Sequence, residues 1–371
     1  MNPLPFNRIR FGINYVPSRK WWYCWNDFQP DEIAPDLDAV AMLGADHIRV
    51  MLLWPSFQPN RRWVSPAHLD RLDVFMKLAG ERGLDVCVTA LTGWLSGWAF
   101  RPAFDRPDNF YEGAEMREPV EIYLRACAER LNQHTNFLGF DLGNELNYCW
   151  RAKTTEIGDA WMDWALGLCE SLCPQAVHVN GVDHQPWFYP ETFSAQKLAT
   201  RPRLATIHAW IEFTGALKRG GPGAPVCTHL APAMAALVRA FAGDGGRPVW
   251  LQEFGSSFLW IGEKQVPGFL EQSVRAALAG GICWITWWCS HDIPREFQFP
   301  AIEYDMGLLD TENRAKPAGE IFRGLAREFG GKPVLPPPAL DLLPLPAMGE
   351  DRRATFENTW AWLEAAQKIL A

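Results

Sequence analysis

Two glutamates follow apolar segments of the chain in a pattern that could support acid–base and nucleophilic chemistry. Glu145 comes directly after Asn144 near the end of FLGFDLGNELNY, and Glu253 ends PVWLQE. An acid and a carboxylate that flank one bond can cleave a glycosidic linkage, because one protonates the leaving oxygen while the other attacks the anomeric carbon. Cleavage with retention of configuration needs the two carboxyl groups about 5–5.5 Å apart. Each glutamate alone could also form a structural ion pair, so the two must be considered together.

Further polar and aromatic residues occupy comparable positions in other apolar segments. Arg49 lies in HIRV, His208 and Trp210 lie in ATIHAW, and Trp288 lies in ITWWCSHD. An arginine that pairs with a carboxylate lowers the pKa of that carboxylate, so Arg49 is a candidate for keeping Glu253 ionised. A histidine such as His208 could instead be a hydrogen-bonded barrel residue, and it implies no metal.

Eight short apolar runs, rich in β-branched and aromatic residues, must position these side chains. Runs of this length suit strands buried on both faces, as in a parallel sheet. Helical patterns lie between them, so the chain alternates β and α eight times. The eight runs are Ile9–Tyr15, His47–Leu53, Leu84–Leu91, Phe137–Leu142, Ala176–Asn180, Leu204–Trp210, Pro248–Phe254 and Gly281–Trp288.

This alternation predicts an α/β fold, a (β/α)8 TIM barrel in a single domain, with chemistry at the carboxyl ends of the strands. An open doubly wound sheet is disfavoured, because no G-x-G-x-x-G follows the first run. Residues 1–330 hold the eight units, and residues 331–371 form a C-terminal extension packed on the barrel. Within it, the proline-rich segment Lys332–Pro346 is predicted to be extended, and Arg352–Leu370 is predicted to be an amphipathic helix.

The composition excludes several other classes of protein. The chain has 371 residues, of which 48 % are hydrophobic, and a net charge of −8, so it is neither disordered nor suited to nucleic acid. No apolar run is long enough to cross a membrane. The nine cysteines are scattered and the N-terminus lacks an apolar leader, which favours a cytoplasmic protein, or a periplasmic one if a leader has been removed.

The segments that carry the two glutamates resemble the strand ends of glycoside hydrolase family 5, a family of clan A retaining glycosidases. FDLGNELN is similar to the strand-4 Asn-Glu signature of the family, and VWLQEFGSS is similar to its strand-7 nucleophile motif. The resemblance covers roughly residues 9 to 330. It implies that Glu145 is the acid/base and Glu253 the nucleophile. It also implies substrate-binding roles for Arg49, Asn144, His208, Trp210 and Trp288.

Two positions depart from the family pattern. The usual histidine at the end of strand 3 is replaced by Leu91-Thr92, and the usual tyrosine of strand 6 is replaced by Trp210. An indole offers an N–H donor but no hydroxyl. The departure at Trp210 therefore puts the expected tyrosine contact with the nucleophile in question.

Within the family, the segments FGINYVPSRKWWYCW, IRVMLLWPSFQPNRRW and LTGWLSGW are most similar to a β-mannosidase subfamily. This resemblance implies hydrolysis of β-mannosidic bonds in short substrates such as Man-β-1,4-GlcNAc or manno-oligosaccharides. We expect exo action, because tryptophans in the first three β-α loops could close a groove into a pocket. They are Trp21, Trp22, Trp25, Trp54, Trp63, Trp94 and Trp98. If they pack into the rim instead, an open groove would suit an endo-acting mannanase or cellulase-type enzyme.

Other functions remain alternatives at this stage. A metal-dependent barrel hydrolase would need a His-x-His after the first strand, where the chain has Asn14-Tyr15-Val16, so we expect no metal and no cofactor. A non-catalytic sugar-binding barrel is disfavoured by the presence of both glutamates. The expected partner is a small oligosaccharide or glycoside, with no nucleic acid and no membrane. The choice between manno- and gluco-configured sugars and the oligomeric state stay open.

Overall fold

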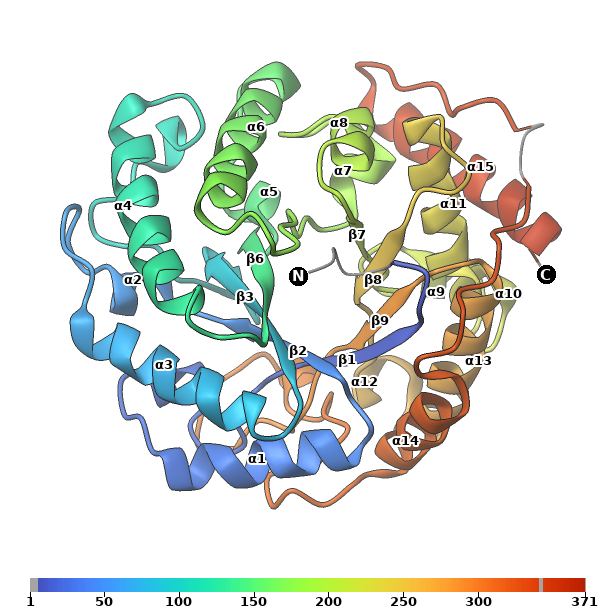
Figure 1. The fold of residues 1–371 in the computed structure, drawn as a ribbon. Coiled ribbons are helices and arrows are strands. Elements are labelled where there is room, and N and C mark those ends of the chain that lie inside the picture. The colour runs from blue at the N-terminus through green and yellow to red at the C-terminus, as the bar shows by residue number, and fades with distance from the viewer. Residues whose placement is uncertain (1–5, 340–342, 371) are drawn as a thin grey trace.

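A curled sheet of seven parallel strands lies at the centre of the molecule, with helices around its outside (Figure 1). The computed structural model describes residues 6–339 and 343–370. The strand order is β6-β3-β2-β1-β9-β8-β7, a half-barrel in which neighbours in the chain pair in parallel. The strands are β1 (Arg10–Asn14), β2 (His47–Met51), β3 (Asp85–Leu91), β6 (Phe137–Gly143), β7 (Ala205–His208), β8 (Val249–Glu253) and β9 (Trp284–Trp287). A small antiparallel hairpin, β4 (Trp94–Leu95) with β5 (Trp98–Ala99), follows β3.

Helices between the strands and after the last strand cover the outer face of the sheet. They are α1 (Pro30–Met42), α3 (Pro66–Gly80), α4 (Ala114–Leu131), α6 (Thr155–Leu172), α8 (Ala195–Thr200), α11 (Leu230–Ala242), α13 (Val266–Ala279), α14 (Pro317–Phe329) and α15 (Arg352–Leu370). Single turns of helix shape the loops: α2 (Trp54–Phe57), α5 (Leu146–Cys149), α7 (Gln185–Phe188), α9 (Ala216–Arg219), α10 (Pro225–Thr228), α12 (Phe258–Ile261), and the 3₁₀ turns η1 (Trp21–Trp25), η2 (Pro107–Asn109), η3 (Glu263–Gln265) and η4 (Ala301–Glu303).

Seven of the eight predicted strands are present, and Ala176–Asn180 is the exception. Val177 and Val179 donate backbone hydrogen bonds to β6 at 2.8 and 2.9 Å, and Val179 forms a parallel bridge with Asp141. The imidazole of His178 accepts the Phe140 N–H. Toward β7, the contact is a side-chain hydrogen bond from the Thr206 hydroxyl to the Asn180 carbonyl. The segment therefore runs beside β6 without forming a regular ladder.

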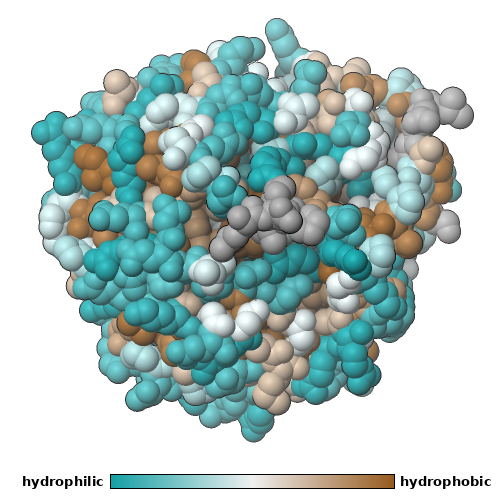
Figure 2. Space-filling model, in the orientation of Figure 1, coloured by the Kyte–Doolittle hydropathy of each residue, from teal (hydrophilic) through white to brown (hydrophobic). Residues whose placement is uncertain are grey.

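Most tryptophans pack into the interior. Eleven of them are among the largest fully buried side chains: Trp21, Trp22, Trp25, Trp54, Trp150, Trp161, Trp187, Trp250, Trp284, Trp287 and Trp360. Burial of these rings removes a large apolar area from water and is a main source of stability. The face of the molecule in Figure 2 is correspondingly hydrophilic, with hydrophobic residues in small patches.

The C-terminal helix α15 spans the predicted residues and packs against α11, α7 and α10. Trp360 is fully buried, and its indole N–H donates to the Thr214 carbonyl at 3.0 Å. Phe356 lies 5.4 Å from the ring of Phe188. The preceding proline-rich segment contains no helix or strand in its described part, while residues 340–342 of it lie outside the described residues.

No helix within the described ranges combines the length and the apolar character that crossing a bilayer requires.

Candidate active site

The two glutamates predicted from the sequence face one another at the carboxyl ends of their strands. Glu145 follows β6 and Glu253 ends β8. A carboxylate oxygen of Glu145, one of Glu253 and a ring nitrogen of His208 all lie within 4.8 Å of one another. This spacing matches the short separation of a pair in which one carboxylate bonds directly to the anomeric carbon, and it is too small for the wide pair that admits a water molecule.

A buried arginine holds Glu253 in place. The Arg49 guanidinium, fully buried on β2, donates to Glu253 Oε1 at 2.5 Å and to Asp141 Oδ2 at 2.7 Å. It also donates to the side-chain oxygens of Asn144, at 2.9 Å, and Asn14, at 3.1 Å. Burial opposes the charge of Arg49, but Asp141 and Glu253 raise its pKa. The arginine therefore remains a cation and stabilises the charge of Glu253.

His208, which ends strand β7, and Trp210, two residues later, supply two more hydrogen-bond donors. His208 Nδ1 lies 2.9 Å from Glu145 Oε1 and 3.4 Å from Glu253 Oε2, so its proton faces both carboxylates. Burial opposes a charge on His208, but the charges of Glu253 and Glu145 raise the pKa of its imidazole. The Trp210 indole N–H donates to Glu253 Oε2 at 3.3 Å. Trp210 therefore supplies a donor to Glu253 from the position where the family pattern has a tyrosine.

Glu145 differs from Glu253 in both backbone and electrostatic environment. It has φ 48° and ψ 50°, a left-handed conformation that costs energy for a residue with a side chain. Its N–H donates to the Gly181 carbonyl at 2.9 Å, and its carbonyl accepts from Tyr148. Burial, followed by the charge of Glu253, raises the pKa of Glu145 to about 7, although the hydrogen bond to His208 opposes this. Glu145 is therefore able to hold a proton near neutral pH.

Both glutamates line a cavity of about 560 Å³. Of the residues predicted for the site, Asn144, Glu145, Trp210, Glu253 and Trp288 line this cavity. Arg49 and His208 lie behind it, in contact with the two glutamates. The adjacent Trp287 is fully buried and packs on Phe254 instead. The rest of the lining is Trp94, Ser96, Gly97, Tyr148, Asp183, His184, Gln185, Tyr189, Phe213, Pro300, Ile302, Glu303, Met306 and Phe356.

Most of the tryptophans expected to wall the cavity do not line it. Of the seven, only Trp94 lies in the cavity wall. Trp21, Trp22, Trp25 and Trp54 are fully buried in the interior. Trp63 and Trp98 are each half exposed and are not part of the lining. The expectation was wrong for these six side chains. The four buried rings gain more in the core than they would at a solvent-exposed rim, whereas Trp63 and Trp98 lie on the surface outside the lining.

Several lining residues carried no signal in the sequence. Glu303 belongs to the loop after β9, Ser96 to the β4–β5 hairpin, and Phe356 to α15. Glu303 and Ser96 lie in connecting segments, which have no periodicity that would mark them. Phe356 lies on the predicted amphipathic helix, but only the tertiary fold places that helix at the cavity. Asp141 could have been found, since a carboxylate in the otherwise apolar run FLGFDLG needs a buried partner such as Arg49.

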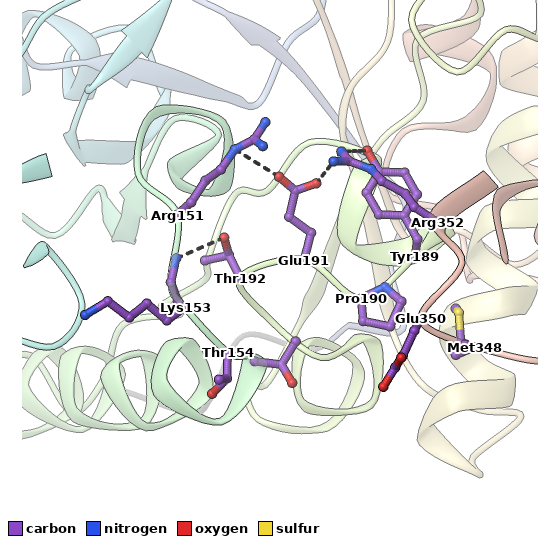
Figure 3. A pocket seen from close by; sticks show the side chains of 13 residues that line it. Arg151, Lys153, Thr154, Tyr189, Pro190, Glu191, Thr192, Met348, Glu350 and Arg352 are labelled. Carbon is purple, nitrogen blue, oxygen red and sulfur yellow. Dashed lines mark hydrogen bonds and ion pairs between the residues drawn. The ribbon is translucent and has the colours of Figure 1, made fainter. Parts of the chain in front are cut away.

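A second hollow of about 540 Å³ lies beside the first and shares Tyr189 with it. Figure 3 shows the side chains of Arg151 and Arg352 pointing toward the Glu191 carboxylate, with N–O distances of 3.2 and 2.8 Å. Arg352 also donates to the Tyr189 hydroxyl at 2.5 Å and lies over its ring. These contacts fasten the start of α15 to the wall of the larger cavity.

The cluster of Glu145, His208 and Glu253 has the composition of a metal site. Its atoms, however, are engaged in hydrogen bonds with one another, and the Arg49 guanidinium lies 2.5 Å from Glu253. A fixed positive charge at that distance opposes a second cation, so these residues fit proton transfer better than metal binding.

Known structures resemble this fold. A GH5_18 protein from Streptomyces cattleya, solved with Manβ1-4GlcNAc, is 32 % identical; the match covers 97 % of this chain and 91 % of that one, with a TM-score of 0.87. A GH5_18 protein from Bifidobacterium longum subsp. infantis is 31 % identical over 88 % of this chain and 80 % of that one, with a TM-score of 0.82. An exo-β-1,4-mannosidase from Opitutaceae bacterium strain TAV5 is 26 % identical over 89 % and 63 %, with a TM-score of 0.77. No protein-family model and no curated protein matches the chain.

A curled parallel sheet that holds two facing glutamates at its carboxyl edge defines a glycoside hydrolase of the barrel class. The structural relatives identify the family within this class. The chain belongs to glycoside hydrolase family 5, and the resemblance seen in the sequence is confirmed.

The buried arginine generates the first testable prediction. Arg49→Met leaves Asp141 and Glu253 as uncompensated buried charges, so the free energy of unfolding should fall by about 3–5 kcal/mol. Urea denaturation at pH 7 measures this change. The matched control is Arg19→Met, which breaks the exposed ion pair with Glu312 and should cost less than about 1 kcal/mol. Equal losses in the two variants would contradict the role of Arg49.

Proposed function

We propose that this protein is a retaining, exo-acting β-mannosidase that removes the terminal mannose of short β-mannosides such as Manβ1-4GlcNAc. The observation that carries the proposal is the close Glu145–Glu253 pair, opening into one confined cavity of about 560 Å³. The choice of sugar is supported by structural relatives that were solved with Manβ1-4GlcNAc or are described as an exo-β-1,4-mannosidase.

The contacts of the two glutamates support different roles for them. Glu253 accepts hydrogen bonds from Arg49 and Trp210, which favour its ionised form, so we assign it as the nucleophile. Glu145 has a pKa of about 7 and is able to donate a proton, so we assign it as the acid/base. Asn144, fixed by Arg49 and by its donation to the Trp94 carbonyl at 2.8 Å, is suited to hold a sugar hydroxyl beside the reacting carbon.

The reaction then proceeds in two displacements. Glu145 gives its proton to the glycosidic oxygen as the bond from that oxygen to the anomeric carbon breaks, and a Glu253 oxygen bonds to the anomeric carbon. The aglycone leaves as an alcohol. Glu145, now a carboxylate, takes a proton from water, whose oxygen attacks the same carbon and releases Glu253. Two inversions leave the configuration unchanged. Trp288, which lines the cavity, is placed to contact the sugar face.

We also propose that the chain forms a complete (β/α)8 barrel with a C-terminal extension. The segment Ala176–Asn180 acts as the eighth strand of a (β/α)8 barrel, supported by its backbone hydrogen bonds to β6. Residues 1–330 form the catalytic barrel, and residues 331–371 form an extension whose α15 contributes Phe356 to the cavity.

All nine cysteines are free, which supports a reducing compartment such as the cytoplasm.

Retention of configuration tests the pairing of the two glutamates. Wild-type protein acting on a nitrophenyl β-mannoside should first release β-mannose, which proton NMR distinguishes from the α anomer before mutarotation. Release of α-mannose first would show a single displacement and overturn the double-displacement proposal.

The assigned roles predict opposite responses to substitution. Glu145→Ala should reduce turnover about 10²–10⁴-fold, most for poor leaving groups, and azide should restore activity on an activated substrate. Glu253→Ala should abolish turnover for every leaving group, and a 2-fluoro mannoside should label Glu253. Labelling of Glu145 would reverse the assignment.

The wild-type pH profile gives a second measure of the Glu145 role. The pKa of about 7 belongs to a carboxyl that is useful only when protonated. kcat/KM should therefore fall as pH rises through about 7, and this basic limb should be lost in Glu145→Ala. The other ionisable side chains that contact Glu145 or line the same cavity include His208, Glu253, Asp183 and Glu303.

The exo assignment is tested by product analysis on mannohexaose. The confined cavity favours one terminal sugar, so mannose should appear from the start with mannopentaose as the first other product. Early mannobiose and mannotriose without mannose would show endo action. Faster cleavage of cello-oligosaccharides would overturn the choice of sugar while leaving the family assignment intact.

A further inference from the structure

A third carboxylate faces the cavity and has no assigned task in the reaction. Glu303 ends the 3₁₀ turn η4, in the loop between β9 and α14, and lines the cavity together with both assigned glutamates. Among the described residues, its carboxylate forms no ion pair with an arginine, lysine or histidine and accepts no hydrogen bond of normal geometry. Burial, followed by the charges of Glu253 and Glu145, raises the pKa of Glu303 to about 7, although the nearby Ser96 hydroxyl opposes this shift.

The hairpin β4–β5 presents a second unsatisfied group beside Glu303. Ser96 has φ 48°, a strained conformation for a residue other than glycine, and its side chain is only 8 % exposed. Its hydroxyl lines the cavity and faces Glu303, yet it has no hydrogen-bond partner among the described residues. Within the part of the chain that the structure describes, the Ser96 hydroxyl and the Glu303 carboxylate have only one another as close polar neighbours, and a carboxylate can accept several more hydrogen bonds. Their remaining hydrogen-bonding capacity faces the cavity, where a ligand hydroxyl can use it.

Aromatic packing closes the cavity at this end. A Cβ on Gly97 would lie 3.0 Å from Pro300, so the hairpin and the loop touch. Behind them, Phe299 packs on Trp21 and Trp98, with ring centroids 4.8 and 6.4 Å apart. A sugar chain that continued past Glu303 would meet this contact between the hairpin and the loop. The opposite end is lined by Asp183, His184, Tyr189 and Phe356, from the segment before α8 and from α15, and it leaves room for the aglycone.

We propose that Glu303, with Ser96 beside it, binds the 4-hydroxyl of the terminal non-reducing sugar and so selects chain ends for cleavage. A β-1,4 chain would continue from that hydroxyl. A free 4-OH donates a hydrogen bond to the carboxylate, whereas a glycosylated oxygen has no proton to donate, and the sugar attached to it would meet the contact between Gly97 and Pro300. Glu303 is thus a specificity-determining residue, and the proposal rests on the exo-glycosidase function given above.

The chemistry of Glu303 favours a neutral polyol over other ligands. A carboxylate accepts hydrogen bonds from hydroxyls, and a strained, buried serine can donate to or accept from a neighbouring hydroxyl. An anionic sugar substituent would meet Glu303, Glu145 and Glu253 together and be repelled. Of the groups that a terminal sugar can offer here, hydroxyls satisfy both side chains.

The experiment removes either the Glu303 carboxylate from the protein or one hydroxyl from the substrate, and then both together. Wild type, Glu303→Ala and Glu303→Gln are assayed on a nitrophenyl β-mannoside and on its 3-, 4- and 6-deoxy analogues. A hydrogen bond to a charged group contributes about 1.5–3 kcal/mol, so the 4-deoxy substrate should lose roughly 10–150-fold in kcat/KM with wild type. Glu303→Ala should lose a similar factor on the parent substrate and show no further loss on the 4-deoxy analogue. Glu296→Gln, an exposed position in the same loop, should behave as wild type.

Each remaining outcome counts against the proposal. A full 4-deoxy penalty in Glu303→Ala would overturn it, and so would a penalty that vanishes only for the 3- or 6-deoxy analogue. Wild type is first compared on β-mannoside and β-glucoside, and the deoxy series is built on the better substrate. A preference for glucoside therefore overturns the mannosidase proposal while Glu303 is still tested. If neither is cleaved, both proposals fail.

The thermal stability of Glu303→Gln distinguishes a carboxylate that binds a ligand from one that is paired within the fold. The pKa of Glu303 is raised in the folded state, so its favourable contribution is present below about pH 4.5 and is lost as the pH rises through about 7. Glu303→Gln removes this cost, and its Tm relative to wild type should be higher at pH 8 than at pH 5. A lower Tm for Glu303→Gln at both pH values would show that the carboxylate is paired within the fold, which contradicts the proposal.

Discussion

The site depends on one buried positive charge. Arg49 lies at the centre of the sheet with no exposure to solvent, and its guanidinium joins Asp141 of β6 to Glu253 of β8. Two carboxylates and two asparagine side chains surround it, so its donors are well satisfied in a place where an unpaired charge would be prohibitive. The same pairing fixes the register of the strands that carry the site. Stability of the fold and ionisation of Glu253 therefore rest on the same contacts.

The two glutamates obtain different chemistry from this shared environment. Glu253 faces Arg49 and the Trp210 indole, whereas Glu145 sits farther from the arginine on a strained residue. The close approach behind Glu145 requires Gly181, because a Cβ there would lie 2.8 Å from Asp141. Two unit charges within 4.8 Å of one another repel by roughly 3–4 kcal/mol at an effective dielectric constant of 20. That repulsion is relieved when Glu145 is protonated, which suits an acid beside an anionic nucleophile.

The sequence predicted the parts of the molecule that local patterns determine. Buried parallel strands read as continuous apolar runs, and α15 begins and ends at the predicted residues. Both glutamates were found because a charge that ends such a run is conspicuous. The role of the tryptophans could not be predicted, since a large ring gains by burial wherever the loop folds inward. Nor could Glu303, Ser96 or Phe356 be found, because only the tertiary fold brings three distant segments to one cavity. Ala176–Asn180 has a strand-like composition, but His178 takes the Phe140 N–H that faces it.

The distribution of charge around the cavity links stability to selectivity. Arg49 lies behind Glu253, and none of the residues that line the cavity is a lysine or an arginine. Arg49 balances Glu253 from behind, whereas Glu145, Glu303 and Asp183 face a ligand with no arginine or lysine among the lining residues. In the free protein this arrangement costs energy, which raised pKa values of Glu145 and Glu303 partly relieve. A neutral sugar relieves it further by donating hydroxyl protons, while an anionic ligand adds to it. The carboxylates that cost energy in the free protein therefore also favour a ligand with a hydroxyl-bearing chain end over a charged or extended ligand.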